Sequence, residues 1–270
     1  MKEKTILLSI VVLLSTAGFT QAQEAELSGT FEMKYLSEHI WRGFHLYGSQ
    51  GAFQTSLDLD LYGTGFGFSI GWSRPVGSGA ENLEWIPITL YYKSTMFEAE
   101  SHATDYQIGW RYYNFPDSSY TDFDMQEMFA SLSWPNILPA GIVPSYTIVV
   151  VWPSSSASLV SETGGWLHIL GIDYAWAMQG LTDEMSEQVL NLHAELVYND
   201  GFGSSFLRDG VVGGPRVDHD WSHFVIGAST DFEIAENLTF TPGLYHQLSM
   251  EDSVDEGSET WVTLSMKYKF

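Results

Sequence analysis

Charged side chains alternate with apolar ones in several segments of this 270-residue chain. In the stretch TSLDLDLY, Asp58 and Asp60 alternate with Leu57, Leu59 and Leu61. Every second residue of a strand lies on one face, so the carboxylates share one face and the leucines the other. The carboxylates could attract cations if water reaches them, or pair with basic side chains as structural salt bridges. The segments with this pattern supply the following candidates: Glu32, Lys34, Asp58, Asp60, Lys93, Arg111, Glu127, Asp173, His193, Glu195, Asp231 and Lys267.

A metal site is a second chemical possibility on this face. His193 and Glu195 are two residues apart, and Asp173 or Asp231 could approach them from neighbouring strands. A hydrogen-bonded pair is the better interpretation, because no further histidine or fixed ligand geometry accompanies them.

Acidic loops offer another place for a hard cation such as calcium or magnesium. The loop VDHDW (residues 217–221) could act together with Asp252, Asp255 and Glu256. These loops lack EF-hand spacing, so solvated acidic loops are the default interpretation. We therefore predict no metal and no cofactor.

A serine and a histidine suggest hydrolytic chemistry as a further alternative. Ser222 and His246 are expected to face outward near one rim, on neighbouring strands, as a lipid-modifying hydrolase would require. No nucleophile motif surrounds either residue, so we predict that the protein is not an enzyme.

These side chains need strands to position them, and the chain supplies about twelve segments of the ~9–11 residues that a tilted bilayer-spanning strand requires. The aromatic residues at the ends of their apolar faces are typical of membrane interfaces; these are Trp72, Tyr92, Trp134, Trp152, Trp176 and Tyr198. Connections also alternate between tight turns and long loops, as in barrels of the outer membrane. We predict an all-β fold, an antiparallel up-and-down transmembrane β-barrel of about 12 strands over residues 23–270.

The bulk composition agrees with such a barrel and limits its partners. Only 17% of the residues are charged and 15% are aromatic, so apolar side chains are expected to face outward, toward a lipid bilayer. Residues 1–22 are typical of a signal peptide, and their removal changes the formal charge from −23 to −24. So acidic a chain disfavours nucleic acid as a partner. The absence of Cys excludes disulfides and thiolate chemistry.

The last residues resemble the C-terminal strand by which outer-membrane barrels are recognised. Alternate apolar residues end in Tyr268 and Phe270. We predict that these two residues form an assembly signal, that the outer-membrane assembly machinery is a partner, and that the protein lies in the cell outer membrane.

A motif near the N-terminus carries a family resemblance. Trp41, Arg42 and Gly43 are followed by Gln50 and Gly51, and then by the Gly-Phe-rich segment that ends at Trp72. Over about residues 31–72, this series resembles the TorF-type porin family of bacterial outer-membrane proteins. The resemblance implies an outer-membrane barrel with no agreed substrate, and it gives no role to Arg42 or Gly43.

The leading functional prediction is a passive channel for small hydrophilic solutes that weakly prefers cations, since acids outnumber bases on the inner face. A non-conducting structural or adhesive barrel, with acidic extracellular loops as its working surface, is the main alternative, and a lipid hydrolase is the other. The charged inner residues line a pore in the first case and fill the interior in the second. The glycine-rich loop at residues 199–220 could either fold inward as a constriction or simply be mobile. The sequence does not predict the oligomeric state.

Overall fold

The computed structural model describes residues 26–118, 123–139, 141–155, 163–179, 187–204, 207 and 216–270. The predicted signal peptide lies outside these residues. Twelve long strands form the wall, with lengths of 9 to 15 residues. They are β1 (Ser28–Leu36), β4 (Ala52–Asp60), β5 (Phe66–Pro75), β6 (Ile86–Met96), β7 (Thr104–Asn114), β8 (Met125–Ser133), β9 (Ile142–Pro153), β10 (Gly165–Gln179), β11 (Glu187–Asp200), β12 (His219–Thr230), β14 (Leu238–Ser249) and β15 (Glu259–Lys269). Short elements are β2 (Ile40–Trp41), β3 (Phe44–His45), β13 (Phe232–Ala235) and the 3₁₀ helix η1 (Glu81–Leu83).

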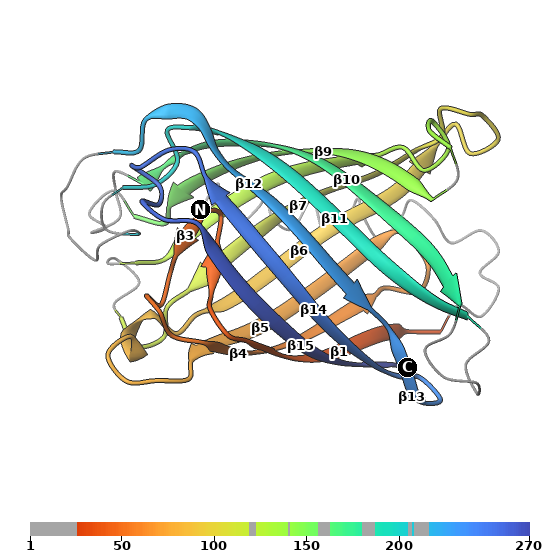
Figure 1. Ribbon diagram of the computed structural model, residues 1–270, viewed down its shortest axis with the longest axis horizontal. Coiled ribbons are helices and arrows are strands. Elements are labelled where there is room, and N and C mark those ends of the chain that lie inside the picture. Colours follow the sequence, from red (N-terminus) through yellow and green to blue (C-terminus); the bar gives the residue numbers. More distant parts are fainter. Residues whose placement is uncertain are drawn as a thin grey trace, which may run out of the picture.

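The wall strands close into one antiparallel barrel, as the sequence predicts (Figure 1). Each strand pairs with the next along the chain, and β1 pairs with β15 to close the ring. At this closure the backbones of Gly29 and Phe270 exchange both N–H···O hydrogen bonds, at 2.9 and 3.0 Å. Closure leaves no free strand edge, which a bilayer would penalise.

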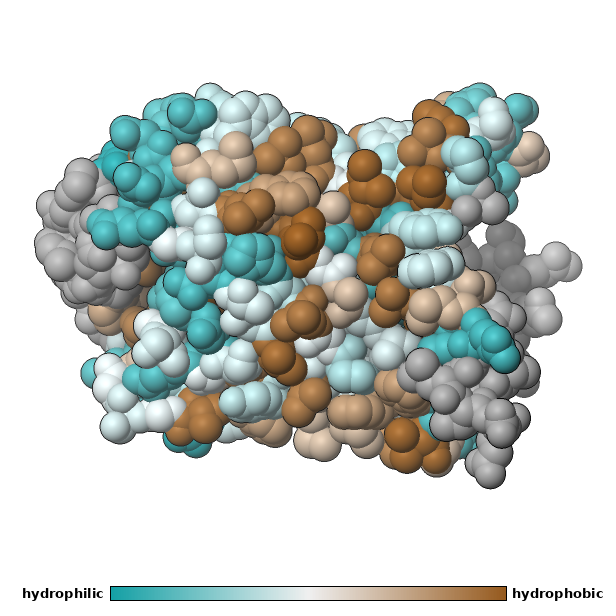
Figure 2. All heavy atoms as spheres, in the orientation of Figure 1, coloured by the Kyte–Doolittle hydropathy of each residue, from teal (hydrophilic) through white to brown (hydrophobic). Residues whose placement is uncertain are grey.

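Apolar side chains cover the outside of the barrel. Leu59, Phe68 and Leu90 are direct neighbours across β4, β5 and β6, on the outer face. Figure 2 shows hydrophobic residues across the middle of the wall, with hydrophilic residues concentrated toward one end. This is the arrangement that a lipid-embedded barrel requires. None of the described residues forms a helix long and apolar enough to cross a membrane.

On the inner face, aromatic rings lie across glycines of the neighbouring strand. Gly67 is paired with Tyr91, and Gly227 with Tyr245. A Cβ at Gly67 would lie 2.1 Å from Tyr91 Cζ, and one at Gly227 would lie 2.2 Å from Tyr245 Cδ1. Any larger residue would force the ring away from the wall. Glycine therefore allows these rings to lie flat and leaves space in the interior.

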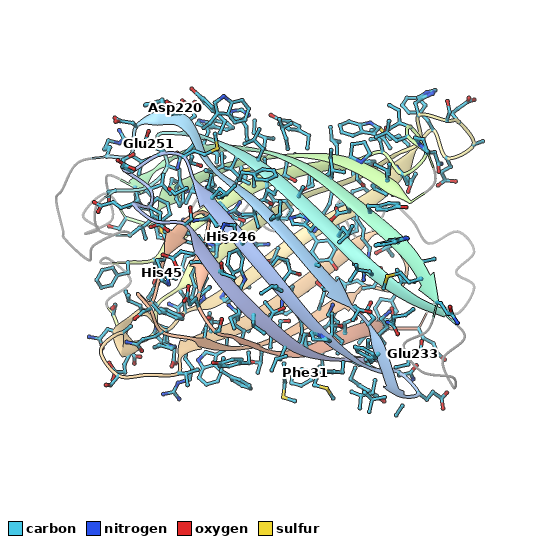
Figure 3. All side chains as sticks on the ribbon, viewed as in Figure 1. Phe31, His45, Asp220, Glu233, His246 and Glu251 are labelled. Carbon is cyan, nitrogen blue, oxygen red and sulfur yellow. The ribbon has the colours of Figure 1, made fainter. Side chains whose placement is uncertain are left out.

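The two ends of the barrel differ in their connections. The end with tight turns, which we call the turn end, carries the β4–β5 turn and β13. The opposite end, the loop end, carries the long connections, including the one between β1 and β4. In Figure 3, Asp220 and Glu251 lie at the loop end, whereas Glu233 lies at the turn end. In outer-membrane barrels the longer loops are extracellular.

Candidate functional site

The connection between β1 and β4, residues 37–51, folds into the loop end of the barrel, and we call it the inner loop. It contains the β2–β3 hairpin, in which Trp41 pairs with Phe44. The two residues between them, Arg42 and Gly43, have φ of 57° and 90°. Two positive φ values in succession are typical of a tight type I′ hairpin turn, for which a glycine at the second position is well suited. The Arg-Gly pair of the motif thus forms the tip of the β2–β3 hairpin. This hairpin lies within the loop end of the barrel (Figure 1).

The inner loop is held by apolar packing. Phe44 and Tyr47 are fully buried, with exposed fractions of 0% and 2%. Trp41 makes edge-on contacts with Tyr113 of β7 and with Phe202, at ring centroid distances of 5.4 and 5.6 Å. Together with wall residues and other loops, these side chains form one hydrophobic cluster that fills the loop end. In this conformation, the loop end of the lumen is occupied by protein.

A buried ionic cluster holds the tip of the hairpin. Arg42 Nη2 donates to Glu127 Oε2 at 2.8 Å, and Arg111 Nη1 donates to Glu127 Oε1 at 2.8 Å. Tyr113 also donates its hydroxyl to Glu127 Oε2, at 2.8 Å. Glu127 is wholly shielded from solvent, and the Arg42 side chain is 14% exposed. A buried carboxylate of this kind depends on its partners, because the loss of one leaves a charge without compensation.

A histidine at the base of the inner loop is buried against aromatic rings. His39 is 3% exposed and packs edge-on against Tyr47 and Trp85, at 4.6 and 5.8 Å. Its Nε2 lies 3.3 Å from the side-chain amide nitrogen of Gln54, which makes Nε2 the acceptor. Burial, with a smaller effect from nearby His45, lowers the pKa of His39 to about 3. The ring is therefore neutral near pH 7.

Further contacts join the inner loop to the other long connections. Gln247 Nε2 donates to the carbonyl oxygen of Gly43 at 3.0 Å, and it lies 3.4 Å from Asp255 Oδ2. Burial raises the pKa of Asp255, and nearby Glu259 adds to that effect. Gln50, from the motif, donates to the carbonyl oxygen of Ser78 at 2.8 Å.

Gly51 of the motif is tightly packed where the inner loop ends. A Cβ at Gly51 would lie 2.6 Å from the Leu36 carbonyl oxygen. The motif residues therefore shape the inner loop and attach it to its surroundings, a structural role that the sequence did not predict.

The predicted inner charges form four separate groups along the wall, namely three pairs and the group of Glu32 with Lys34 and Lys267. Lys93 Nζ lies 3.1 Å from Asp60 Oδ2, and His193 Nδ1 lies 2.8 Å from Asp173 Oδ1. Arg111 and Glu127 form the third pair, in the ionic cluster described above. The candidates thus do not converge on a single centre.

The other candidates contact polar neighbours. Asp58 accepts a hydrogen bond from the Tyr91 hydroxyl at 2.8 Å, and the Asp231 carboxylate accepts one from Thr241. Glu195 Oε2 lies 3.9 Å from His193 Nε2. Glu32 Oε1 lies 3.5 Å from Lys34 Nζ and 4.0 Å from Lys267 Nζ.

Open space remains toward the turn end of the lumen. One cavity of about 610 Å³ is lined by Asp60, Lys93 and Asp105, among other residues. A second, of about 470 Å³, is lined by Asp173, Asn191 and His193, among others. The polar candidates near the turn end therefore border open cavities, whereas the loop end is filled with packed side chains.

The serine and histidine expected to form a hydrolytic pair are not together, and the outward orientation expected for Ser222 is wrong. Ser222 is fully buried, and its Oγ contacts His223 Nδ1 at 2.8 Å and the Val197 carbonyl oxygen at 3.3 Å. His246 pairs across the strands with Ile226, and its Nδ1 lies 2.7 Å from Thr260 Oγ1. A register irregularity between Val197 and Tyr198 explains the error, because it breaks strict alternation at Ser222.

The described part of the glycine-rich loop folds inward. The Asn199 side chain donates to the Phe202 carbonyl oxygen at 2.8 Å and accepts from the Phe202 amide at 2.7 Å. This places Phe202 against Trp41 and Phe44. The rest of the loop, residues 205–206 and 208–215, lies outside the described residues. Among the described residues, no group of three or more His, Asp or Glu side chains is arranged to hold a metal ion.

Twelve long antiparallel strands that close on themselves, apolar outside and largely polar inside toward the turn end, define a β-barrel of the outer-membrane type. No protein-family model and no curated protein matches the sequence. Among solved structures, the KdgM porin is similar at a TM-score of 0.51 and 10% identity, covering 90% of this chain and 99% of that chain. The NanC porin in its rhombohedral crystal form has the same TM-score and identity, covering 90% and 100%.

A structure described as the KdgM porin in complex with disordered oligogalacturonate reaches a TM-score of 0.50 at 9% identity, covering 90% of this chain and 99% of that chain. At such identities the likeness establishes the fold alone. It agrees with the architecture that the family resemblance implied, while membership of the TorF-type family stays a prediction.

Proposed function

We propose that the protein is an outer-membrane channel of the porin type, which passes small hydrophilic solutes and weakly prefers cations. One observation carries the proposal: the inner wall is polar and borders open cavities from the turn end inward, while the outer wall is apolar. A solid structural barrel would not need a hydrated interior. The similarity of fold to two porins supports the same function.

The inner loop is the closing element of this channel. It fills the loop end with Phe44 and Tyr47 and is attached to the wall through Arg42 and Glu127. Passage of a solute then requires the inner loop to move out of its packed position at the loop end. The cation preference follows from Asp58 and Asp173, for which no lysine or arginine partner is described, and it is weak because Lys93 compensates Asp60 and the arginines compensate Glu127.

A non-conducting structural barrel is the second candidate, and the hydrophobic cluster at the loop end favours it. The two functions differ in what happens when the inner loop is shortened. Replacement of residues 38–50 by a short Gly-Ser turn should open a channel and raise single-channel conductance in a planar bilayer well above that of the wild type.

Shortening the β6–β7 connection at residues 99–101, at the turn end and away from the inner loop, is the matched control and should leave conductance unchanged. Heat-modifiable migration on gels would verify that both variants fold. A folded inner-loop variant that neither conducts ions nor allows swelling of sugar-loaded liposomes would favour the structural barrel.

A further inference from the structure

A cavity of about 400 Å³ lies beneath the tip of the β2–β3 hairpin. Its lining includes Trp41 and Arg42 from the hairpin, Glu195 from β11, and Gln247 and Trp261 from β14 and β15. Its volume falls within the range typical of small-molecule sites. It shares His193 and Tyr245 with the 470 Å³ cavity, and so the two spaces adjoin on the turn-end side.

The charges around this cavity are balanced. Arg42 and Arg111 both contact Glu127, and Glu195 supplies a second carboxylate on the cavity wall. Two guanidinium groups thus face two carboxylates, and His193, which also lines the cavity, is paired with the carboxylate of Asp173. A bound ion of either sign would add an uncompensated charge to this partly buried cluster, which is costly. The balance favours an uncharged solute.

One polar atom in the cavity wall lacks a partner. The Gln247 side chain is fully buried, and its Nε2 donates to the Gly43 carbonyl oxygen, whereas Oε1 has no hydrogen-bond partner among the described residues. A buried amide oxygen in this state needs a donor. A solute hydroxyl could donate to it, while the Glu195 carboxylate could accept and Arg42 could donate to other hydroxyls.

Flat aromatic surfaces complete the cavity. The rings of Tyr245 and Trp261 are stacked, with centroids 5.6 Å apart and planes 14° apart. Gly227 permits the Tyr245 ring to lie against the wall. Such surfaces suit a solute that has apolar C–H faces as well as hydroxyls.

We propose that this cavity binds one neutral polyhydroxylated solute, about the size of a monosaccharide. The inference rests on the proposed channel for its route of access, which adjoins the cavity at His193 and Tyr245. It names the class of solute that binds in this part of the lumen.

Isothermal titration calorimetry on the purified full-length barrel in detergent tests the site, with glucose, glucuronate and glucosamine as probes of nearly equal shape and different charge. Glucose should bind about tenfold more tightly than either charged sugar. Gln247→Leu should weaken glucose binding about tenfold, because it removes the unpaired acceptor. Gln107→Leu, in the cavity at the turn end, is the matched control and should not.

A second variant guards against a merely structural effect of the Gln247 substitution. Glu195→Gln leaves the cavity with an excess of positive charge and should reverse the order, so that glucuronate binds more tightly than glucose. The site is refuted if wild-type protein binds none of the three sugars, or if it prefers a charged one. Conductance is measured separately, on the variant with the shortened inner loop. Conductance in that variant without glucose binding to the wild type contradicts this site only, whereas glucose binding to the wild type without conductance in that variant contradicts the channel only.

Discussion

Arg42 and Glu127 are 85 residues apart in the sequence, yet Arg42 Nη2 donates to Glu127 Oε2 at 2.8 Å. The pair joins the tip of the inner loop to the inner face of β8, where Glu127 has no access to solvent. Removal of one member of a buried pair costs about 3–5 kcal/mol, although Arg111 and Tyr113 would still compensate part of the charge here. The interaction is therefore the main polar attachment of the hairpin tip.

Arg42→Ala should release the inner loop and raise the open probability in planar bilayers without loss of the folded barrel. Arg74→Ala is a suitable control. Arg74 is half-exposed at the rim, and its ion pair with Glu84 is long, at 3.8 Å. Glu127→Gln should act in the same direction, and the double variant should show less than the sum of the two effects. Equal conductance of wild type and Arg42→Ala would contradict the attachment.

The turn of the hairpin allows a test of packing alone. Gly43 and Gly48 both have positive φ, 90° and 58°, so alanine is strained at either position. A Cβ at Gly43 would lie 2.6 Å from His223 Nδ1 and 2.8 Å from Val254 Cγ1, whereas one at Gly48 would meet nothing within 4 Å. Gly43→Ala should thus open the channel and Gly48→Ala should not. If both variants open the channel equally, backbone strain causes the opening and the close packing of the hairpin tip does not.

Much of this architecture could be predicted from the sequence, because period-2 alternation directly encodes which side chains face lipid. Asp58 and Asp60 on the inner face and Leu59 on the outer face follow from alternation alone. The inner loop could not be predicted in the same way, since the contact of Arg42 with Glu127 depends on barrel closure. One signal was available: Ile40, Trp41, Phe44, Leu46 and Tyr47 make the loop too apolar to lie in water. The register at Ser222 failed because a local irregularity interrupts the alternation.

Acid should loosen the inner loop through His39. The pKa of His39 is lowered to about 3, so the unseated loop, with a histidine pKa near 6.5, binds a proton more readily than the seated one. The packed conformation of the inner loop keeps its full stability above about pH 6.5 and loses about 2 kcal/mol of that stability by pH 5. Asp255, whose pKa is raised by burial, acts in the opposite direction, and we expect His39 to dominate because it is more deeply buried.

A cysteine reporter can follow this release, because the chain contains no Cys. Leu46→Cys places a thiol at a buried position of the inner loop, and Val76→Cys places one at an exposed position. Labelling of the first relative to the second should rise between pH 7.5 and pH 5, and His39→Gln should abolish that rise. A ratio that does not depend on pH would contradict the role of His39.

The orientation of the wall predicts how the barrel tolerates charge. Leu90 is exposed on the outer face, with Phe68 and Trp110 as its cross-strand neighbours. Leu90→Lys should destabilise the barrel by about 2–4 kcal/mol if the residue lies near the bilayer midplane. Ser69→Lys, on the inner face one strand away, should cost much less. Urea titration in lipid vesicles measures both, and equal losses would contradict the assignment of inner and outer faces.

The C-terminal strand provides a test of assembly. The Phe270 and Tyr268 rings are stacked on the outer face, with centroids 6.4 Å apart, and the Phe270 backbone pairs with Gly29 at the barrel closure. Deletion of Phe270 should therefore lower the yield of heat-modifiable barrel in the outer membrane. Substitution of the neighbouring Lys269 by Gln is the control and should leave the yield unchanged. A normal yield after the deletion would show that the predicted assembly signal lies elsewhere.

Ion preference depends on which inner carboxylates lack a basic partner. Asp60 is compensated by Lys93 at 3.1 Å, whereas Asp58 accepts only from the Tyr91 hydroxyl among the contacts described for it. In the variant with a shortened inner loop, the channel should be modestly cation-selective at low salt. The preference should weaken as screening shortens the reach of these charges to about 8 Å near physiological ionic strength. Asp58→Asn should move the reversal potential in a salt gradient toward zero, and Lys93→Gln should move it the other way by freeing Asp60. Anion preference in the parent channel, or shifts of the same sign in both variants, would show that these side chains do not border the conducting path.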